Sequence, residues 1–113
     1  MDYLHKIENE RQFTRAVREE AEIAGWELIY HTHDSQRSDP GFPDLVLVRG
    51  DRIIFAELKY YRGYEDWDTR RKRKAAVTAD QKRWINGLAK VPGIEVYIWR
   101  YPADVNRLID VLN

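Results

Sequence analysis

Two acidic residues and a lysine stand at the ends of two neighbouring apolar runs of this chain. Asp44 opens the run 45–48, and Glu57 and Lys59 close the run 53–58. Strand interiors disfavour these residue types, because a buried charge requires a partner or a metal ion. Two carboxylates and a lysine gathered in this way are typical of a divalent-metal site that attacks a phosphodiester bond.

The carboxylates of Asp44 and Glu57 are the oxygen ligands that Mg²⁺ or Mn²⁺ prefers, and these ions keep several waters. A lysine beside the metal orients the attacking water or stabilises the charge that develops on the phosphate. The plain alternative is an ion pair between Glu57 and Lys59 at a sheet edge. The preceding Pro43-Asp44, at the distance of a short hairpin, favours catalysis over that alternative.

A hairpin is expected to bring these side chains together. The runs 44–48 and 52–59 are joined by the turn 49–51, Arg-Gly-Asp. Side chains alternate across a strand, so Glu57 and Lys59 share one face. Because the start of the first hairpin strand lies beside the end of the second, the three charged side chains are expected to meet.

Periodicity predicts a mixed-sheet α/β domain in the order α-β-β-β-α-β-α. Apolar residues recur at helical spacing over 9–24, with Asn9 as N-cap and Gly25 as the stop. The other expected elements are a strand over 26–32 in which Leu28 and Tyr30 alternate with Glu27 and Ile29, a loop over 33–43, a helix over 79–90 with Thr78 as N-cap and Trp84, Ile85 and Leu88 inward, a strand over 94–100 and a helix over 103–112. Trp26, Trp84 and Trp99 are expected in the core.

Bulk properties restrict the class of protein. The 113 residues suit one domain over 1–113, and the absence of cysteine excludes disulfides and thiolate zinc sites. No apolar run approaches the roughly 20 residues that cross a bilayer, and no signal-peptide pattern is seen, so a cytoplasmic protein without membrane contact is expected. The net charge is zero, but the first 22 residues are acidic and 70–74 are basic. A nuclease fits this distribution, since its metal site requires acids and its substrate requires a basic flank.

Pro43-Asp44, a hairpin and Glu57-Leu58-Lys59 resemble the signature of the PD-(D/E)xK nuclease superfamily. More narrowly, nearly the whole chain resembles the virus-type replication-repair nuclease (VRR-NUC) domain, whose short bacteriophage members are stand-alone domains of about this size. The segments that carry this resemblance are 25–26, 30–33, 41–44, 55–59, 78–81 and 96–100. The resemblance implies a restriction-endonuclease-like fold and DNA cleavage that depends on Mg²⁺ or Mn²⁺.

The resemblance also assigns roles to single residues. Asp44, Glu57 and Lys59 match the central motif, and the backbone carbonyl of Leu58 is implied as a further metal ligand. Lys59 is implied to position or activate the water. Family members place a glutamate on the first helix, and Glu10 matches it best by its distance to Phe13 and to Gly25-Trp26.

Two of these matches have competing explanations. Glu20 is the rival of Glu10 for the helix-1 acid, and Glu10 is also explained as a first-turn acid favoured by the helix dipole. Gln81 matches the family's glutamine on the helix after the catalytic strands, where it would bond a phosphate, the water or a catalytic side chain. Its plain alternative is a solvated first-turn glutamine.

Several residues are expected to contact DNA or a second copy of the chain. The basic run consists of Arg70, Arg71, Lys72, Arg73 and Lys74 and is expected to bind phosphates. Ser38 lies in the loop before Asp44, within reach of a phosphate. Tyr61, Tyr64 and Trp67 suit stacking on unpaired bases or, in our preferred interpretation, a dimer interface. They lie in a link, 60–77, that is longer than the short Gly-containing turn common in the family.

His31 and His33 share one side of a strand end, but no third metal ligand accompanies them, so phosphate positioning or polar packing is favoured over metal binding. The expected function is structure-selective DNA endonuclease activity of the Holliday-junction-resolvase type, performed by a homodimer on branched or four-way DNA. The alternatives are a flap, nick-adjacent or non-specific DNA nuclease, a catalytically inert DNA-binding module, and a protein–protein adaptor.

Overall fold

The computed structural model describes residues 7–32, 37–61 and 76–113. Its elements confirm the expected order α-β-β-β-α-β-α. They are α1 (Glu10–Ile23), β1 (Leu28–His31), β2 (Leu45–Arg49), β3 (Arg52–Tyr60), α3 (Ala79–Ala89), β4 (Ile94–Tyr101) and α4 (Val105–Leu112). Both predicted N-caps of the first two helices are present: the Asn9 side chain accepts from the Gln12 N–H, and that of Thr78 accepts from the Gln81 N–H. Gly25, with a φ of 86°, follows α1 as expected.

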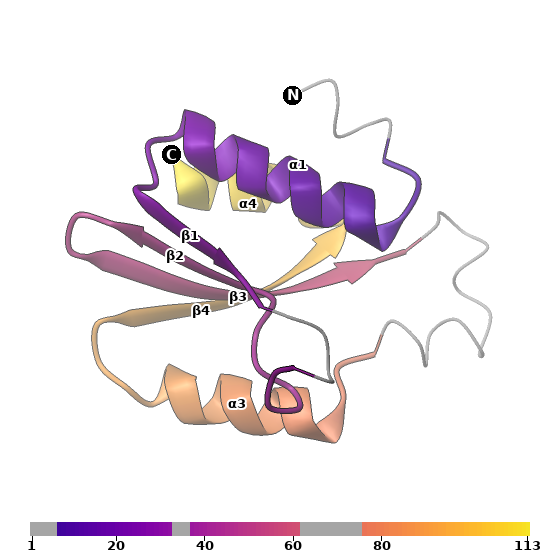
Figure 1. Cartoon of the computed structure of the whole chain (residues 1–113), viewed down its shortest axis with the longest axis vertical. Helices are drawn as coiled ribbons and strands as arrows, with labels where there is room; N and C mark the ends of the chain where they lie inside the picture. The colour runs from indigo at the N-terminus through magenta and orange to yellow at the C-terminus, as the bar shows by residue number, and fades with distance from the viewer. Residues whose placement is uncertain (1–6, 33–36, 62–75) are drawn as a thin grey trace.

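The strands form one mixed sheet in the order β1-β2-β3-β4. β1–β2 and β2–β3 are antiparallel, whereas β3–β4 is parallel. Helices α1 and α4 cover one face of the sheet and α3 lies on the other (Figure 1). Within the described residues, no helix combines the length and the apolar character that a membrane span requires.

The main core lies between the sheet and the α1/α4 layer. Its largest fully buried side chains come from the sheet, from α1 and from α4: Trp99, Phe13, Leu45, Leu47, Ile54, Leu58, Leu108, Leu112 and Val17. The buried Trp26 closes one end, where its indole N–H donates to the Leu112 carbonyl at 2.9 Å. Trp26 and Trp99 are therefore core aromatics, as expected.

The α3 face is packed less completely. Trp84, Ile85 and Leu88 are half-buried, and α3 has no fully buried residue. Phe42 bridges this layer, with its ring 5.1 Å from Trp84 and 6.2 Å from Phe55 in edge-to-face contacts. Trp84 therefore points inward, as expected, but it is only half-buried and lies outside the main core, because a single helix covers only part of this face.

The strand expected over 26–32 is shorter in the structure, where β1 spans Leu28–His31. Trp26 lies outside the strand because its side chain packs against the end of α4. Leu28 and Tyr30 are 64% and 49% exposed, and it is Ile29 that packs against the core. The cause is the position of β1 at the sheet edge. Leu28 lies opposite Val48 on the α3 side, but α3 contacts β4 at the other edge and leaves the β1 side open.

Candidate active site

The hairpin brings Asp44 to the middle of β3. Leu45 pairs with Ala56, so Asp44 lies one position beyond, opposite Glu57. A carboxylate oxygen of Asp44, Oδ2, accepts from the Leu58 N–H at 2.7 Å. This hydrogen bond fixes the carboxylate against the strand that carries the other two charged residues.

Glu57 and Lys59 are buried, with exposed fractions of 2% and 7%. Both lie on the α3 face of β3, and Lys59 Nζ is 3.7 Å from Glu57 Oε1. The central position of β3, paired on both sides, explains this burial. The three side chains that the sequence singled out therefore do meet at one place.

Gln81 joins this cluster from α3. Lys59 Nζ donates to Gln81 Oε1 at 2.9 Å, and Gln81 Nε2 donates to Glu57 Oε1 at 2.9 Å. The Thr78 N–H also donates to Gln81 Oε1, which completes a capping box at the start of α3. One amide thus caps the helix and ties Glu57 to Lys59, and the interpretation of Gln81 as a solvated residue is wrong.

A close approach of the Asp44 loop to α3 holds this amide in place. Gly41 has a φ of 85°, and a Cβ at this position would collide with the backbone of Asp80 and Gln81. Only glycine fits both the left-handed conformation and the narrow space. This role was not predicted from the sequence, although a glycine three residues before Asp44 was a usable signal.

Replacing Gly41 with alanine is expected to destabilise the protein by about 3 kcal/mol. About 1–2 kcal/mol comes from the left-handed backbone, and the rest from overpacking against α3. The matched control is Gly25→Ala, because Gly25 also has a positive φ but has nothing within 4 Å of its Cβ position. Urea unfolding of both variants measures the difference, and equal losses would exclude a clash at α3.

Burial and a neighbouring charge weaken the acidity of Glu57. Desolvation first, and then the Asp44 carboxylate, raise the pKa of Glu57 from 4.5 to about 8, against a lowering effect of Lys59. Its second oxygen, Oε2, is buried and has no hydrogen-bond partner among the described residues. A buried carboxylate oxygen without a partner is costly unless something positively charged sits beside it.

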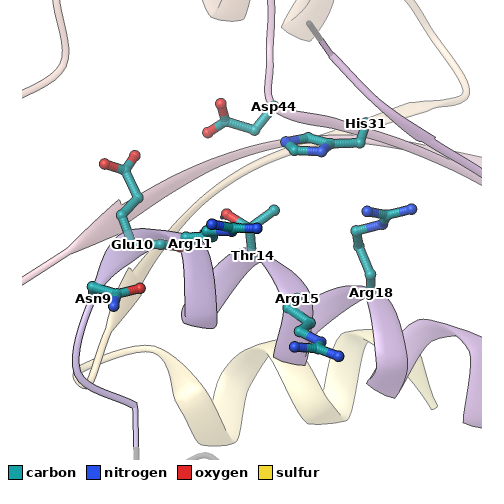
Figure 2. A pocket seen from close by; sticks show the side chains of 8 residues that line it. All are labelled: Asn9, Glu10, Arg11, Thr14, Arg15, Arg18, His31 and Asp44. Carbon is teal, nitrogen blue, oxygen red and sulfur yellow. Dashed lines mark hydrogen bonds between the residues drawn. The ribbon is translucent and has the colours of Figure 1, made fainter. Parts of the chain in front are cut away.

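Glu10 enters the same cluster from the first turn of α1. It is exposed, but partial desolvation and then the Asp44 charge raise its pKa above 4.5, while Lys59 lowers it. Figure 2 shows the Glu10 and Asp44 carboxylates at the same end of an open hollow. Its rival Glu20 lies ten residues further, about 15 Å along the helix axis. The structure therefore groups Glu10, and not Glu20, with Asp44.

The hollow beside the acidic cluster has a volume of about 900 Å³. Its lining comes from α1, the end of β1 and the start of β2: Asn9, Glu10, Arg11, Thr14, Arg15, Arg18, His31 and Asp44. The arginines of this lining were not predicted from the sequence, because an exposed arginine on a helix that binds a ligand has the same pattern as one that is only solvated.

The part of the chain that the structure describes holds no cluster of three or more acidic, histidine or cysteine side chains suited to a metal. The donors that do meet are the carboxylates of Asp44 and Glu57, including the unpartnered Oε2. This set fits Mg²⁺ or Mn²⁺, which bind through one or two carboxylates, substrate phosphates and waters. It does not match a structural zinc site, which is closed by four cysteine or histidine ligands.

Other predicted residues have a less direct place. Ser38 is half-buried in the loop before Asp44, and the half-buried Tyr61 donates its N–H to the Tyr101 carbonyl. The role of the Leu58 carbonyl as a metal ligand stays a prediction. Outside the described residues lie His33, Tyr64, Trp67 and the basic run Arg70, Arg71, Lys72, Arg73 and Lys74.

Comparison with known proteins supports the fold. The sequence matches no family model. It also matches no curated protein sequence. A solved structure described as a "VRR_NUC domain protein" superposes with a TM-score of 0.62, covering 94% of this chain and 90% of the other, at 19% sequence identity. At that identity the likeness concerns the fold. It confirms the restriction-endonuclease-like α/β architecture that the motif resemblance implied.

Proposed function

We propose that this chain, which has the fold of a VRR-NUC domain, is a nuclease that hydrolyses DNA with the help of Mg²⁺ or Mn²⁺. The observation that carries this proposal is the cluster of the half-buried Asp44 with the buried Glu57 and Lys59, which lies beside an open hollow. A structural ion pair would need one acid and one lysine. Burial and the second acid raise the pKa of Glu57, and one of its oxygens has no hydrogen-bond partner among the described residues. Both features suit a binding site better than an ion pair that only stabilises the fold.

In this proposal Asp44 and Glu57 hold the metal, with the Leu58 carbonyl as a further ligand. Glu10 does not complete a group of three acidic ligands with them in the described residues, so as a ligand it would have to move closer to the ion. A bound ion would lower the pKa of the attacking water and neutralise negative charge on the phosphate. Lys59 stabilises charge on the phosphate or orients the water, since its ammonium is held at the floor of the site. Gln81 is a positioning residue, because its amide fixes Lys59 and one oxygen of Glu57.

We also propose a branched DNA substrate, such as a four-way junction, and a homodimer that acts on two of its arms. The apolar surface on the edge strand β1 supports the dimer. Leu28 and Tyr30 are exposed there beside the half-buried Val46 and Val48. Exposed apolar patches of this kind mark interfaces. The cellular roles that go with this proposal are replication and repair of phage DNA in the bacterial cytoplasm.

Cleavage assays test the proposal directly. Labelled four-way junction, flap, single-stranded and linear duplex DNA are incubated with the protein in Mg²⁺, Mn²⁺ or EDTA. The expected result is cleavage that requires metal, with paired nicks on the junction. Lys59→Met keeps the buried aliphatic stem and removes the charge, so it is expected to fold and to lose activity. If the folded wild-type protein cleaves none of the substrates, an inert DNA-binding module becomes the better account.

A further inference from the structure

One flank of α1 forms a basic wall of the hollow beside the acidic cluster. Arg11 and Arg18 both line the hollow and stand seven residues apart, which is two helical turns and places them on one side of α1. The opposite side of the helix is buried in the core through Phe13 and Val17. The two arginines are therefore fixed in direction by the packing of the helix that carries them.

The charges in the hollow are separated into an acidic and a basic part. Figure 2 shows Arg18 reaching from α1 toward the side of the hollow where His31 lies, whereas Arg15 turns away. Arg15 has its own partner, Glu19, at 3.4 Å. Neither Arg11 nor Arg18 has an ion-pair partner within the part of the chain that the structure describes, although two carboxylates line the same hollow.

Helix stability does not explain this placement. Arg11 lies in the first turn of α1, where the helix dipole disfavours a positive charge. Both arginines also stand next to an acidic cluster without neutralising it. Cations held beside carboxylates but apart from them suit a ligand that is itself anionic and extends beyond the metal site.

We propose that Arg11 and Arg18 form a ledge that binds the phosphate backbone of the DNA strand on one side of the scissile phosphate. The planar guanidinium fork matches phosphate oxygens in pairs of hydrogen bonds. Seven helical residues span about 10 Å, or about three nucleotide steps at the 3.4 Å spacing of one strand in duplex DNA. His31, on the opposite wall of the hollow, supplies a further hydrogen-bond donor.

The ledge rests on the proposed nuclease function for its substrate, and it deepens that function. Carboxylates at the site repel phosphates, so the strand must be attracted by charges placed nearby. With the ledge on α1 and the cluster on the hairpin, a strand that lies along α1 is led to Asp44 and Glu57. The ledge thus determines from which side the strand enters the site.

Salt-dependent DNA binding in EDTA tests the ledge without any cleavage. The double variant R11Q/R18Q is compared with the wild-type chain by fluorescence anisotropy on labelled duplex DNA. Each lost phosphate contact is expected to reduce the slope of log K against log salt by about 0.9, so the double variant loses about 1.8. In cleavage assays the double variant is expected to have a higher KM than the wild-type chain and an almost unchanged kcat.

Two matched variants separate a local contact from net charge. Arg15→Gln removes the same charge from the same helix and the same hollow, but from a side chain that pairs with Glu19 and points away from His31, so it is expected to keep most of the wild-type slope. R11K/R18K keeps both charges and is expected to restore most of the slope. All three positions are exposed, so the fold is expected to persist, which circular dichroism checks.

The outcomes distinguish this inference from the function on which it rests. A wild-type slope in R11Q/R18Q, or an equal loss in Arg15→Gln, overturns the ledge even if the protein cleaves DNA. A reduced slope in R11Q/R18Q alone supports the ledge even if the wild-type protein cleaves no substrate. Absence of any DNA binding by the wild-type chain overturns the ledge as a DNA site.

Discussion

Asp44→Asn is expected to lower DNA cleavage at least about a thousandfold, which corresponds to about 4 kcal/mol of transition-state stabilisation. The amide oxygen of asparagine can still accept from the Leu58 N–H, so the link between the Asp44 loop and β3 is retained. What is lost is one of the two negative charges proposed to hold the metal. DNA binding in EDTA at low salt is expected to remain close to that of the wild-type chain.

The matched control is Asp51→Asn, at the other end of the same hairpin. Asp51 is exposed in the turn between β2 and β3, so its replacement removes an equal charge from a place without catalytic partners. Cleavage and binding are measured in parallel for both variants. If Asp44→Asn loses binding as strongly as cleavage, Asp44 is structural, and if it still cleaves at the wild-type rate, the proposed metal site is wrong.

Glu57→Gln is expected to have opposite effects on activity and on stability. It removes a proposed metal ligand, so cleavage is expected to fall as steeply as in Asp44→Asn. In the metal-free protein it also removes a buried negative charge that faces Asp44. The Gln81 amide can still donate to the oxygen of the new side chain, and the added amide nitrogen occupies the place of the unpartnered Oε2.

The pH dependence of unfolding measures this effect. The pKa of Glu57 is raised from 4.5 to about 8, so the folded chain holds a proton that the unfolded chain has released. Wild-type stability in EDTA is therefore expected to fall as pH rises from 4.5 to about 8, by an amount on the order of 5 kcal/mol, and then to level off. Glu10, whose pKa is also raised, adds to this fall.

Glu57→Gln is expected to lack most of this fall in stability. Its free energy of unfolding is therefore expected to equal that of the wild-type chain near pH 4.5 and to exceed it above pH 8. Glu95, whose pKa is lowered by its hydrogen bond to Arg52, affects stability only below its ordinary value of 4.5 and does not disturb this window. Urea unfolding across the pH range in EDTA gives both curves. A wild-type stability that is flat or rises over the window would falsify the assignment of a buried repulsion to Glu57.

The hairpin is the part of the site that the sequence predicts best. The two strands that position Asp44 and Glu57 are joined by a turn of two residues. The contact between these side chains therefore depends only on local strand pairing and on the alternation of side chains. The same holds for α1, whose N-cap Asn9 and stop Gly25 are signals next to the helix itself. Local rules are sufficient where the contacts are local.

The remaining features depend on contacts between distant parts of the chain. Gln81 reaches Glu57 and Lys59 only because α3 docks against the sheet after a long link, and no local signal fixes that docking. The exposure of Leu28 and Tyr30 follows from the edge over which α3 lies. Periodicity shows that a strand has two faces, but it does not show how much of each face a single helix covers.

The uneven packing of the two layers gives the parts of the site different lifetimes. β3, paired on both sides and buried on the main core, belongs to the cooperative unit that opens only when the whole protein unfolds, so its amides are the slowest to exchange hydrogen. α3 has no fully buried residue and detaches at a lower free energy. The Gln81 amide is therefore expected to leave the site and return many times before the strand that carries the carboxylates opens once.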